Sequence, residues 1–220
     1  MSYLNFKSEY DRFPKTTIKN HKAFRGYDEI YHELNSKMNN RCVVVFDYYP
    51  GVDEEEVYEL IKRFNFSLEI NMHDIFKDGK TMTEQMKYNL TDDRVFGKMY
   101  YGNLVDFIDE EKLEEAKNKV EEHHGSTIIY GVGAGLVSHG DLYIYFDMAR
   151  WEIQQRFRRH EVKALGIDNR NDAVSLQYKR GYFNDWRVCD RYKERLFDRV
   201  EFWIDTHVAG TPKMIDKDTF

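Results

Sequence analysis

The chain has 220 residues, 41% of them hydrophobic, and carries a formal net charge of −6 at pH 7 with a pI near 5.8. Its length and apolar content suit one domain with a well-formed core. The acidic balance argues against a nucleic-acid or anionic-membrane partner, because binding to phosphate backbones relies on basic surface. Two cysteines are too few for a disulfide framework, and no apolar run approaches membrane-spanning length, so we expect a soluble cytoplasmic protein.

The first expected elements are a helix and a buried strand. Residues 1–20 show no clear period and are expected to be extended. Apolar residues from Tyr27 to Met38 recur at the spacing of an amphipathic helix, and two asparagines follow it. The run from Cys42 to Phe46 is rich in valine, which is typical of a strand buried on both faces. A sheet is therefore expected to begin here.

The stretch at 41–64, RCVVVFDYYPGVDEEEVYELIKRF, has the order of a phosphate-binding strand, loop and helix but lacks the residues that bind phosphate. A phosphate loop needs glycines for close backbone approach, a lysine for the phosphate oxygens and a hydroxyl for magnesium. This loop offers only Gly51. Asp53 is the expected N-cap of the next helix, and the glutamates at 54–56 form an acidic first turn in which the third completes a capping box. The residues alone favour an ordinary acidic helix start.

The rest of the chain alternates between strands and helices. We expect strands at 67–72, 127–132, 142–146 and 200–204, and helices at 53–64, 110–124, 149–160 and 171–196. This alternation predicts an α/β fold with a parallel five-stranded sheet and helices on both faces. A further helix is expected to begin after Pro212.

Ligands in such sheets bind beyond the carboxyl ends of the strands. Asp74 follows the second strand and could accept a proton or a hydrogen bond from a sugar hydroxyl, although a cap or turn role explains it equally well. The glycines at 131–135 form only part of a dinucleotide fingerprint, so a tight strand exit is the plainer interpretation. The candidate ligand-binding residues at this edge are Asp47, Tyr48, Tyr49, Gly51, Asp74, Gly131 and Gly133.

Arg150, Arg156 and Arg159 are candidate phosphate ligands on the helix expected at 149–160. Guanidinium groups bind phosphate through charge-assisted hydrogen bonds. Arg156 and Arg159 lie three residues apart on one helix face, whereas Arg150 points elsewhere, so a solvated helix face is the simpler interpretation. The eight histidines are scattered, and no metal site is expected.

The order of these elements resembles the uridine-kinase branch of the P-loop kinases. The similar segments are NMHDIFKDG at 71–79, TDDRVFG at 91–97, STIIYGVGAGLV at 126–137, DLYIYFDMARWEIQQRFRRH at 141–160 and YKRGYFNDWRVCDRYKERLFDRVEFWIDT at 178–206. The fourth of these resembles the strand and arginine-bearing helix that lead into a mobile lid. The resemblance implies a P-loop-kinase-like domain with a degenerate phosphate loop and with Asp74 as the candidate catalytic residue.

A second set of segments is similar to the amino-terminal region of long bacterial class I mannose-6-phosphate isomerases. These segments are YYPGVDEEEV, MTEQMKYNLTDDRVFGKMYYG, GDLYIYFDMARWEIQQRFR and KRGYFNDWRVCDRYKERLFDRV. In that family a kinase-like region precedes cupin domains that hold zinc and isomerise the sugar phosphate. The resemblance implies an extension and helix at 1–40, a kinase-like domain at 41–206 and, at 207–220, the start of a connection to a cupin part. It implies zinc only in that cupin part and no cofactor in this domain.

Two main functions follow as expectations. The favoured one is a non-catalytic kinase-like domain of a mannose-6-phosphate isomerase-like protein, which binds a phosphorylated ligand or docks on the cupin part. The alternative is a free-standing phosphotransferase of the nucleoside or sugar kinase type, with Asp74 as base and the arginines as a clamp. A purely structural assembly domain is the third. The expected partners are a phosphorylated small molecule and a cupin domain, with neither nucleic acid nor membrane.

Overall fold

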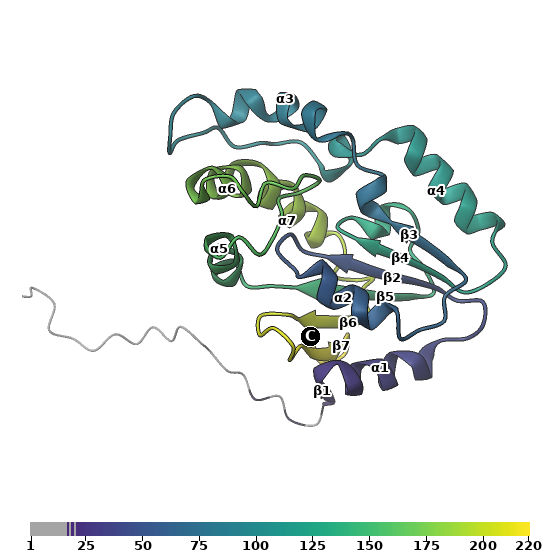
Figure 1. Cartoon of the computed structure of the whole chain (residues 1–220). Coiled ribbons are helices and arrows are strands. Elements are labelled where there is room, and N and C mark those ends of the chain that lie inside the picture. The colour runs from purple at the N-terminus through teal and green to yellow at the C-terminus, as the bar shows by residue number, and fades with distance from the viewer. Residues whose placement is uncertain (1–16, 18, 20) are drawn as a thin grey trace, which may run out of the picture.

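The computed structural model describes residues 17, 19 and 21–220, so the segment expected to be extended lies almost entirely outside the described residues. The described part of the chain forms a seven-stranded sheet with helices packed on it (Figure 1). Across the sheet the strands are β1 (Ala23–Arg25), β7 (Lys213–Asp216), β6 (Phe202–Asp205), β5 (Leu142–Asp147), β2 (Val43–Tyr48), β4 (Thr127–Gly131) and β3 (Leu68–Asn71).

The sheet is mixed rather than purely parallel. Strands β6, β5, β2, β4 and β3 run parallel to one another, whereas β7 is antiparallel to β6, and β1 is antiparallel to β7. The prediction of a parallel five-stranded sheet is therefore wrong, although the fold is α/β. The helix expected after Pro212 is also wrong, because Met214 is fully buried between Phe24 and Ile204 as part of β7. The sheet thus includes strands on both sides of the expected 41–206 unit.

The helices largely follow the periodic segments of the sequence. They are α1 (Gly26–Lys37), α2 (Glu54–Ile61), α3 (Gly79–Leu90), α4 (Glu110–Glu122), α5 (Arg150–Arg158), α6 (Val174–Arg180) and α7 (Trp186–Glu194). A π-helical turn, Gly181–Asp185, separates α6 from α7 and divides the helical tract expected at 171–196. Among the described residues, no helix is long and apolar enough to cross a membrane.

Helices cover both faces of the sheet. The chain passes from β2 through α2 to the edge strand β3 and returns through α4 to β4, which lies between them. Because such crossovers are right-handed, α2 and α4 lie on opposite faces. Helix α1 packs beside α2, where Arg63 and Asp28 form an ion pair at 2.9 Å and the rings of Tyr31 and Phe64 have centroids 4.9 Å apart.

The centre of the core is the pair of strands β2 and β5. Val44, Val45, Phe46, Ile144 and Phe146 have no exposed surface, as is typical of strands covered on both faces. Each such side chain contributes roughly 1.5–3 kcal/mol through burial. The chain leaves β2 towards β3 but leaves β5 towards β6, so the loops at these two carboxyl ends diverge. The buried strands β2 and β5 therefore position two loops that leave the same edge of the sheet in opposite directions.

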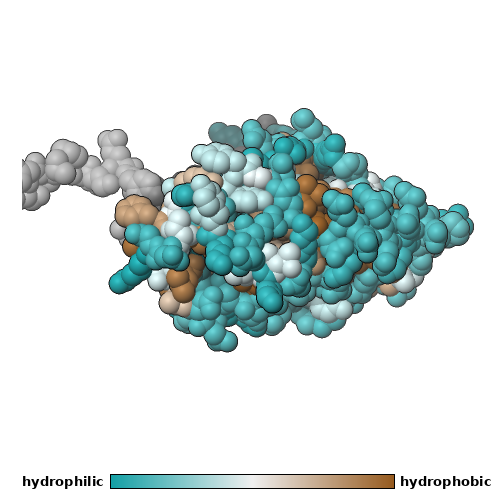
Figure 2. Space-filling view, turned by 90° about the horizontal axis from the view of Figure 1, so that it is seen from above, coloured by the Kyte–Doolittle hydropathy of each residue, from teal (hydrophilic) through white to brown (hydrophobic). Residues whose placement is uncertain are grey.

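The outer surface is mostly polar. The mean hydropathy of the chain is −0.74, and the face shown in Figure 2 is largely hydrophilic with limited hydrophobic areas. Apolar side chains with large exposed fractions include Phe96 at 72% and Val95 at 62%, both in the loop after α3. Scattered exposed side chains of this kind are normal for folded proteins.

Candidate functional site

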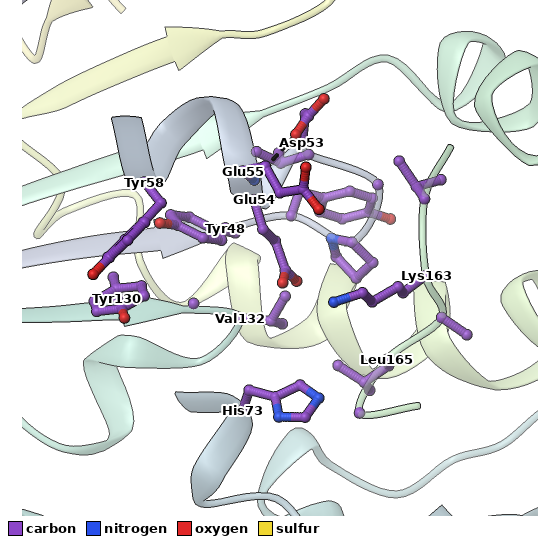
Figure 3. Close-up of a pocket in the computed structure, with 18 of the residues that line it drawn as sticks. Tyr48, Asp53, Glu54, Glu55, Tyr58, His73, Tyr130, Val132, Lys163 and Leu165 are labelled. Carbon is purple, nitrogen blue, oxygen red and sulfur yellow. Dashed lines mark hydrogen bonds between the residues drawn. The ribbon is translucent and has the colours of Figure 1, made fainter. Parts of the chain in front are cut away.

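A pocket of about 630 Å³ lies beyond the carboxyl ends of β2, β3 and β4 (Figure 3). One wall consists of residues 48–55 from the loop after β2 and the first turn of α2, with Tyr58 one turn further on. The opposite wall is the irregular segment 161–167, with Arg170 beside it. The volume lies within the range of small-molecule sites in proteins. The pocket also occupies the edge where ligands bind in α/β sheets.

Asp53 caps the helix that begins at this pocket. One of its carboxylate oxygens accepts hydrogen bonds from the backbone amides of Glu55 and Glu56, each at 3.1 Å. The expected capping box is only half formed, because the Glu56 carboxylate accepts from the Gly210 amide at 2.5 Å instead. Two of the amides that a phosphate would use at this helix end are therefore already bound by the protein's own carboxylate.

The Glu54 side chain extends into the pocket towards Lys163 and His73 (Figure 3). Its carboxylate reaches solvent through the pocket, but the surrounding protein desolvates it and raises its pKa. The charges of Lys163 and His73 oppose that shift. Glu54 thus belongs to a partly desolvated group of charges that face one another across the cavity.

Carboxylates outnumber cations around the pocket. Two lining side chains are permanently cationic, Lys163 and Arg170, and Arg170 is held by Asp168 through an ion pair at 2.7 Å. Five carboxylates line the same pocket: Asp53, Glu54, Glu55, Glu59 and Glu161. Glu59 and Glu161 are neutralised by ion pairs with Lys62 and Arg159, so the excess of negative charge in the cavity comes from Asp53, Glu54 and Glu55.

Three tyrosines, Tyr48, Tyr58 and Tyr130, form one end of the pocket (Figure 3). The rings of Tyr58 and Tyr130 have centroids 5.7 Å apart. Burial raises the pKa of Tyr130 to about 12 and places that of Tyr48 well above its ordinary value, so both stay protonated at neutral pH. Tyr48 is only 2% exposed, and its hydroxyl has no hydrogen-bond partner among the described residues. An unpaired buried hydroxyl is costly, so a bound molecule that supplied a partner would be stabilised.

Asp47 lies in the interior rather than in the pocket. It is fully buried, and its carboxylate accepts hydrogen bonds from the Gly133 amide at 2.9 Å, the Gly135 amide at 3.1 Å and the hydroxyls of Tyr143 and Tyr192 at 2.6 Å each. Burial raises the pKa of Asp47, and these four bonds oppose the shift. Gly133 adopts a left-handed φ of 85°, and the glycine turn directs two amides at one anion. That anion is the protein's own carboxylate.

Arg150 is also engaged away from the pocket. Its guanidinium pairs with Asp190 at 2.8 Å and donates to the Tyr49 hydroxyl at 3.1 Å. The Tyr49 hydroxyl in turn donates to Asp190 at 2.6 Å. Arg150 lies 5.1 Å from the Trp186 ring, which adds a cation–π contact. This group joins α5 to α7 and explains Arg150 without a ligand.

Arg156 and Arg159 have internal partners as well. Arg156 is 3% exposed and donates to the backbone oxygens of Gly51 at 3.2 Å and Thr206 at 2.9 Å. Arg159 pairs with Glu152 at 2.7 Å. Neither lines the pocket. Arg156 therefore stabilises the loop after β2 through its bond to the Gly51 carbonyl. The interpretation of Arg156 and Arg159 as a solvated helix face is wrong for Arg156, because its guanidinium is buried.

The structure brings some of the sequence-selected residues to the pocket and leaves others outside it. Asp74 is exposed in the short turn after β3 and does not line the pocket, whereas its neighbour His73 does. Of the other candidates, Tyr48, Tyr49, Gly51 and Gly131 line the pocket, while Asp47, Gly133, Arg150, Arg156 and Arg159 do not. The carboxyl edge of the sheet therefore predicts which backbone segments line the pocket, but it does not predict which charged side chains enter it.

Sequence reasoning missed Lys163 and the wall that carries it. Segment 161–170 has no period or motif, and long-range bonds set its position. The Leu165 amide donates to Asp185 at 3.2 Å, and the Leu165 carbonyl accepts from Arg180 at 2.8 Å. Arg180 and Asp185 themselves form a buried ion pair at 3.2 Å. The π-helical turn ends at Asp185, and such turns are frequent at functional sites.

The last feature concerns the grouping of side chains that could bind a metal ion. Across residues 17, 19 and 21–220, no group of three or more histidine, cysteine, aspartate or glutamate side chains is arranged to hold a metal ion.

Comparison with known proteins gives one family. The family model described as "Domain of unknown function (DUF8485)" matches residues 26–220, from the start of α1 through β7. No curated protein matches the chain. The matched range includes both walls of the pocket and the π-helical turn that supports one of them. The chain therefore belongs to the DUF8485 family.

Proposed function

We propose that this chain is a non-catalytic, kinase-like domain that binds a phosphorylated small molecule in the pocket at the carboxyl edge of its sheet. The observation that carries the proposal is the pocket of about 630 Å³ beside a loop and helix start that offer a nucleotide neither a lysine nor the serine or threonine hydroxyl of a phosphate loop. The position of the pocket suits a ligand, whereas the loop after β2 lacks the residue types that phosphoryl transfer requires.

Carboxylates of the protein itself occupy backbone amides both at the start of α2 and in the glycine turn, where a nucleotide phosphate would otherwise bind. Asp53 binds two amides at the start of α2, and Asp47 binds two amides of the glycine turn. A triphosphate at this edge would also meet Glu54 and Glu55 in the first turn of α2. These contacts favour binding of a less charged ligand over transfer of a phosphoryl group.

Lys163 is the side chain best placed for a phosphate. It points into the pocket from the wall opposite α2 (Figure 3), and it takes part in no ion pair among the described residues, whereas Arg170 pairs with Asp168. His73 faces the same space. One lysine with a nearby histidine suits a monophosphate, because a triphosphate needs several cations or a metal to neutralise it.

The setting of this function rests on the resemblance of the sequence segments. We propose that the domain acts in cytoplasmic sugar-phosphate metabolism beside a cupin isomerase part, which would hold zinc. A natural reading frame that continues beyond Phe220 into clustered histidine and glutamate ligands would support this setting, and a stop at Phe220 would contradict it.

Calorimetric titration of the purified chain tests the binding function. We expect binding of mannose 6-phosphate or glucose 6-phosphate and no magnesium-dependent binding of ATP. Lys163→Gln should weaken phosphate binding by about tenfold, the loss of one charge-assisted hydrogen bond. The matched control is Lys80→Gln, at an exposed lysine in the first turn of α3 that lies outside the pocket.

Two outcomes would contradict the proposal. Magnesium-dependent ATP binding with release of ADP would establish the phosphotransferase alternative. A failure of all phosphorylated ligands to bind, with Lys163→Gln and the parent chain behaving alike, would leave the pocket without a phosphate ligand.

A further inference from the structure

We propose that the ligand of this pocket carries an ammonium group in addition to its phosphate, and that Glu54, Glu55 and Tyr48 bind this cation. The inference rests on the proposed function, since it assigns the second charged group of the same phosphorylated molecule. It names the ligand class as phosphorylated amino sugars or amino alcohols.

The first argument is the charge of the cavity. Glu59 and Glu161 are paired with Lys62 and Arg159, and the cation Arg170 is paired with Asp168. Three lining carboxylates, Asp53, Glu54 and Glu55, then remain against one unpaired lysine, Lys163, among the described residues. A ligand that brought only a phosphate would add negative charge to this excess. A ligand that also brought an ammonium group would offset part of it, and the two charges of the ligand would meet opposite charges on the two walls.

The second argument separates this helix start from an ordinary acidic first turn. Helix α4 begins in the same way, with Asp109 accepting bonds from the amides of Glu111 and Lys112, but its first turn lies outside this pocket. In α2 the equivalent turn faces a cavity, and Glu54 projects across it (Figure 3). Stabilisation of the helix dipole therefore accounts for the acidic residues of α4, but it leaves the inward position of Glu54 unexplained.

The third argument is the tyrosine end of the pocket. Tyr48 has an unpaired hydroxyl in a position that is 2% exposed, and the negative charge of Glu54 adds to burial in raising its pKa. The paired rings of Tyr58 and Tyr130 stand beside it. An ammonium group here would donate to the Tyr48 oxygen and to a carboxylate, and it would be attracted by the aromatic faces.

Desolvation of Glu54 fits the same occupant. The protein around Glu54 disfavours its charged form, which is why its pKa is raised. A bound ammonium would stabilise the charged form of a carboxylate that water solvates only in part. Lys163 would then be released from its interaction with Glu54 to hold the phosphate at the other wall.

Matched pairs of ligands that differ only in an amine and a hydroxyl test the inference. The first pair is glucosamine 6-phosphate and glucose 6-phosphate, and the second is O-phosphoethanolamine and 2-hydroxyethyl phosphate. Their dissociation constants are measured by calorimetry at pH 7 for the parent chain, Glu54→Gln and Glu55→Gln. The control is Glu110→Gln, which neutralises the equivalent first-turn glutamate of α4. Unfolding curves establish that each variant is folded.

We expect the amine member of at least one pair to bind about tenfold more tightly or better, as for a charge-assisted bond. Glu54→Gln should reduce that preference to about twofold or less, Glu55→Gln should reduce it in the same direction, and Glu110→Gln should leave it unchanged.

The results that contradict the ammonium assignment differ from those that contradict the proposed function. If both members of each pair bind equally, or if the amine preference survives Glu54→Gln and Glu55→Gln, the ammonium assignment is wrong and the proposed function stands. If mannose 6-phosphate binds but no member of either pair does, the ammonium assignment is wrong and the proposed function stands. If mannose 6-phosphate also fails, the proposed function is wrong and this inference falls with it.

Discussion

The Tyr192 hydroxyl on α7 donates a hydrogen bond of 2.6 Å to the carboxylate of Asp47 at the end of β2. Tyr143 on the neighbouring strand β5 donates to the same oxygen at 2.6 Å. Together with two amides of the glycine turn after β4, these contacts join two strands, a helix and a loop through one buried carboxyl group. The contacts make Asp47 a structural residue at the edge of the sheet where ligands bind in α/β folds.

Loss of the Tyr192 hydroxyl should destabilise the fold. Tyr192→Phe removes one bond to a buried carboxylate, and we expect the free energy of unfolding to fall by about 1–3 kcal/mol in urea titrations. The control is Tyr101→Phe at a side chain that is 85% exposed, where a change within about 0.5 kcal/mol is expected. Equal effects of the two variants would contradict the structural role of the Tyr192 bond.

The buried pair Arg180 and Asp185 should hold the pocket wall in place. Asp185→Asn leaves Arg180 buried beside a neutral partner and weakens the bond to the Leu165 amide, so we expect a loss of about 3–5 kcal/mol in the free energy of unfolding. Hydrogen exchange should also accelerate at the Leu165 amide more than in the centre of the sheet.

An exposed acidic residue in the same wall supplies the control for Asp185→Asn. Asp168→Asn breaks a surface ion pair with Arg170, for which a change of about 0–1 kcal/mol is expected. Unchanged exchange at Leu165 in Asp185→Asn would show that the wall is held by other contacts.

The raised pKa of Glu54 gives a pH dependence with a definite sign. Between the ordinary value of 4.5 and the higher pKa of the folded state, the folded chain binds more protons than the unfolded chain. The stability contributed by Glu54 is therefore fully present below 4.5 and is lost as the pH rises through the folded pKa. Glu54→Gln removes this dependence.

Urea unfolding at a series of pH values measures the effect. The unfolding free energy of Glu54→Gln relative to the parent chain should increase as the pH rises from about 4 to about 8. Glu110→Gln should lack this trend. A relative stability that decreases with pH would mean that Lys163 and His73 outweigh desolvation at Glu54.

Gly131 should tolerate no side chain. Its φ of 116° is left-handed, and a Cβ atom would lie 2.8 Å from the Met72 Cβ. Gly26 is a matched control, because its φ of 80° is also left-handed but a Cβ atom there has no neighbour within 4 Å. Gly26→Ala should cost about 1–2 kcal/mol from backbone strain alone, and Gly131→Ala should cost about 1–3 kcal/mol more from the contact. Equal costs would mean that Met72 moves away freely.

The α/β class and the positions of the parallel strands could be predicted because each strand is a distinct apolar run. Strands β1 and β7 could not, since three and four residues are too few to show a period, and their pairing joins Phe24 to Met214 across most of the chain. Met82 and Met86 are the only fully buried apolar side chains of α3, so the sequence gives little helical pattern there.

The pocket could be predicted from the sheet edge, but its charges could not. Side chains alternate along a strand, so Asp47 and Tyr48 point to different sides, and only Tyr48 reaches the pocket. Lys163 lies in a segment whose course depends on Leu165 and Asp185, which are distant in sequence. Pattern and propensity act over a few residues, whereas these positions depend on contacts formed only in the folded chain.

The internal bonds of Asp47 and Asp53 bear on how readily the loop after β2 could be converted into a phosphate loop. A lysine and a hydroxyl introduced after β2 would meet amides that are already bound by aspartate. Removal of Asp47 to free the glycine turn would leave the Tyr143 and Tyr192 hydroxyls unpaired in the interior, and stability would fall before any phosphate could compensate for the loss. Several coupled substitutions would therefore be needed to free the amides at this edge for a phosphate without loss of stability.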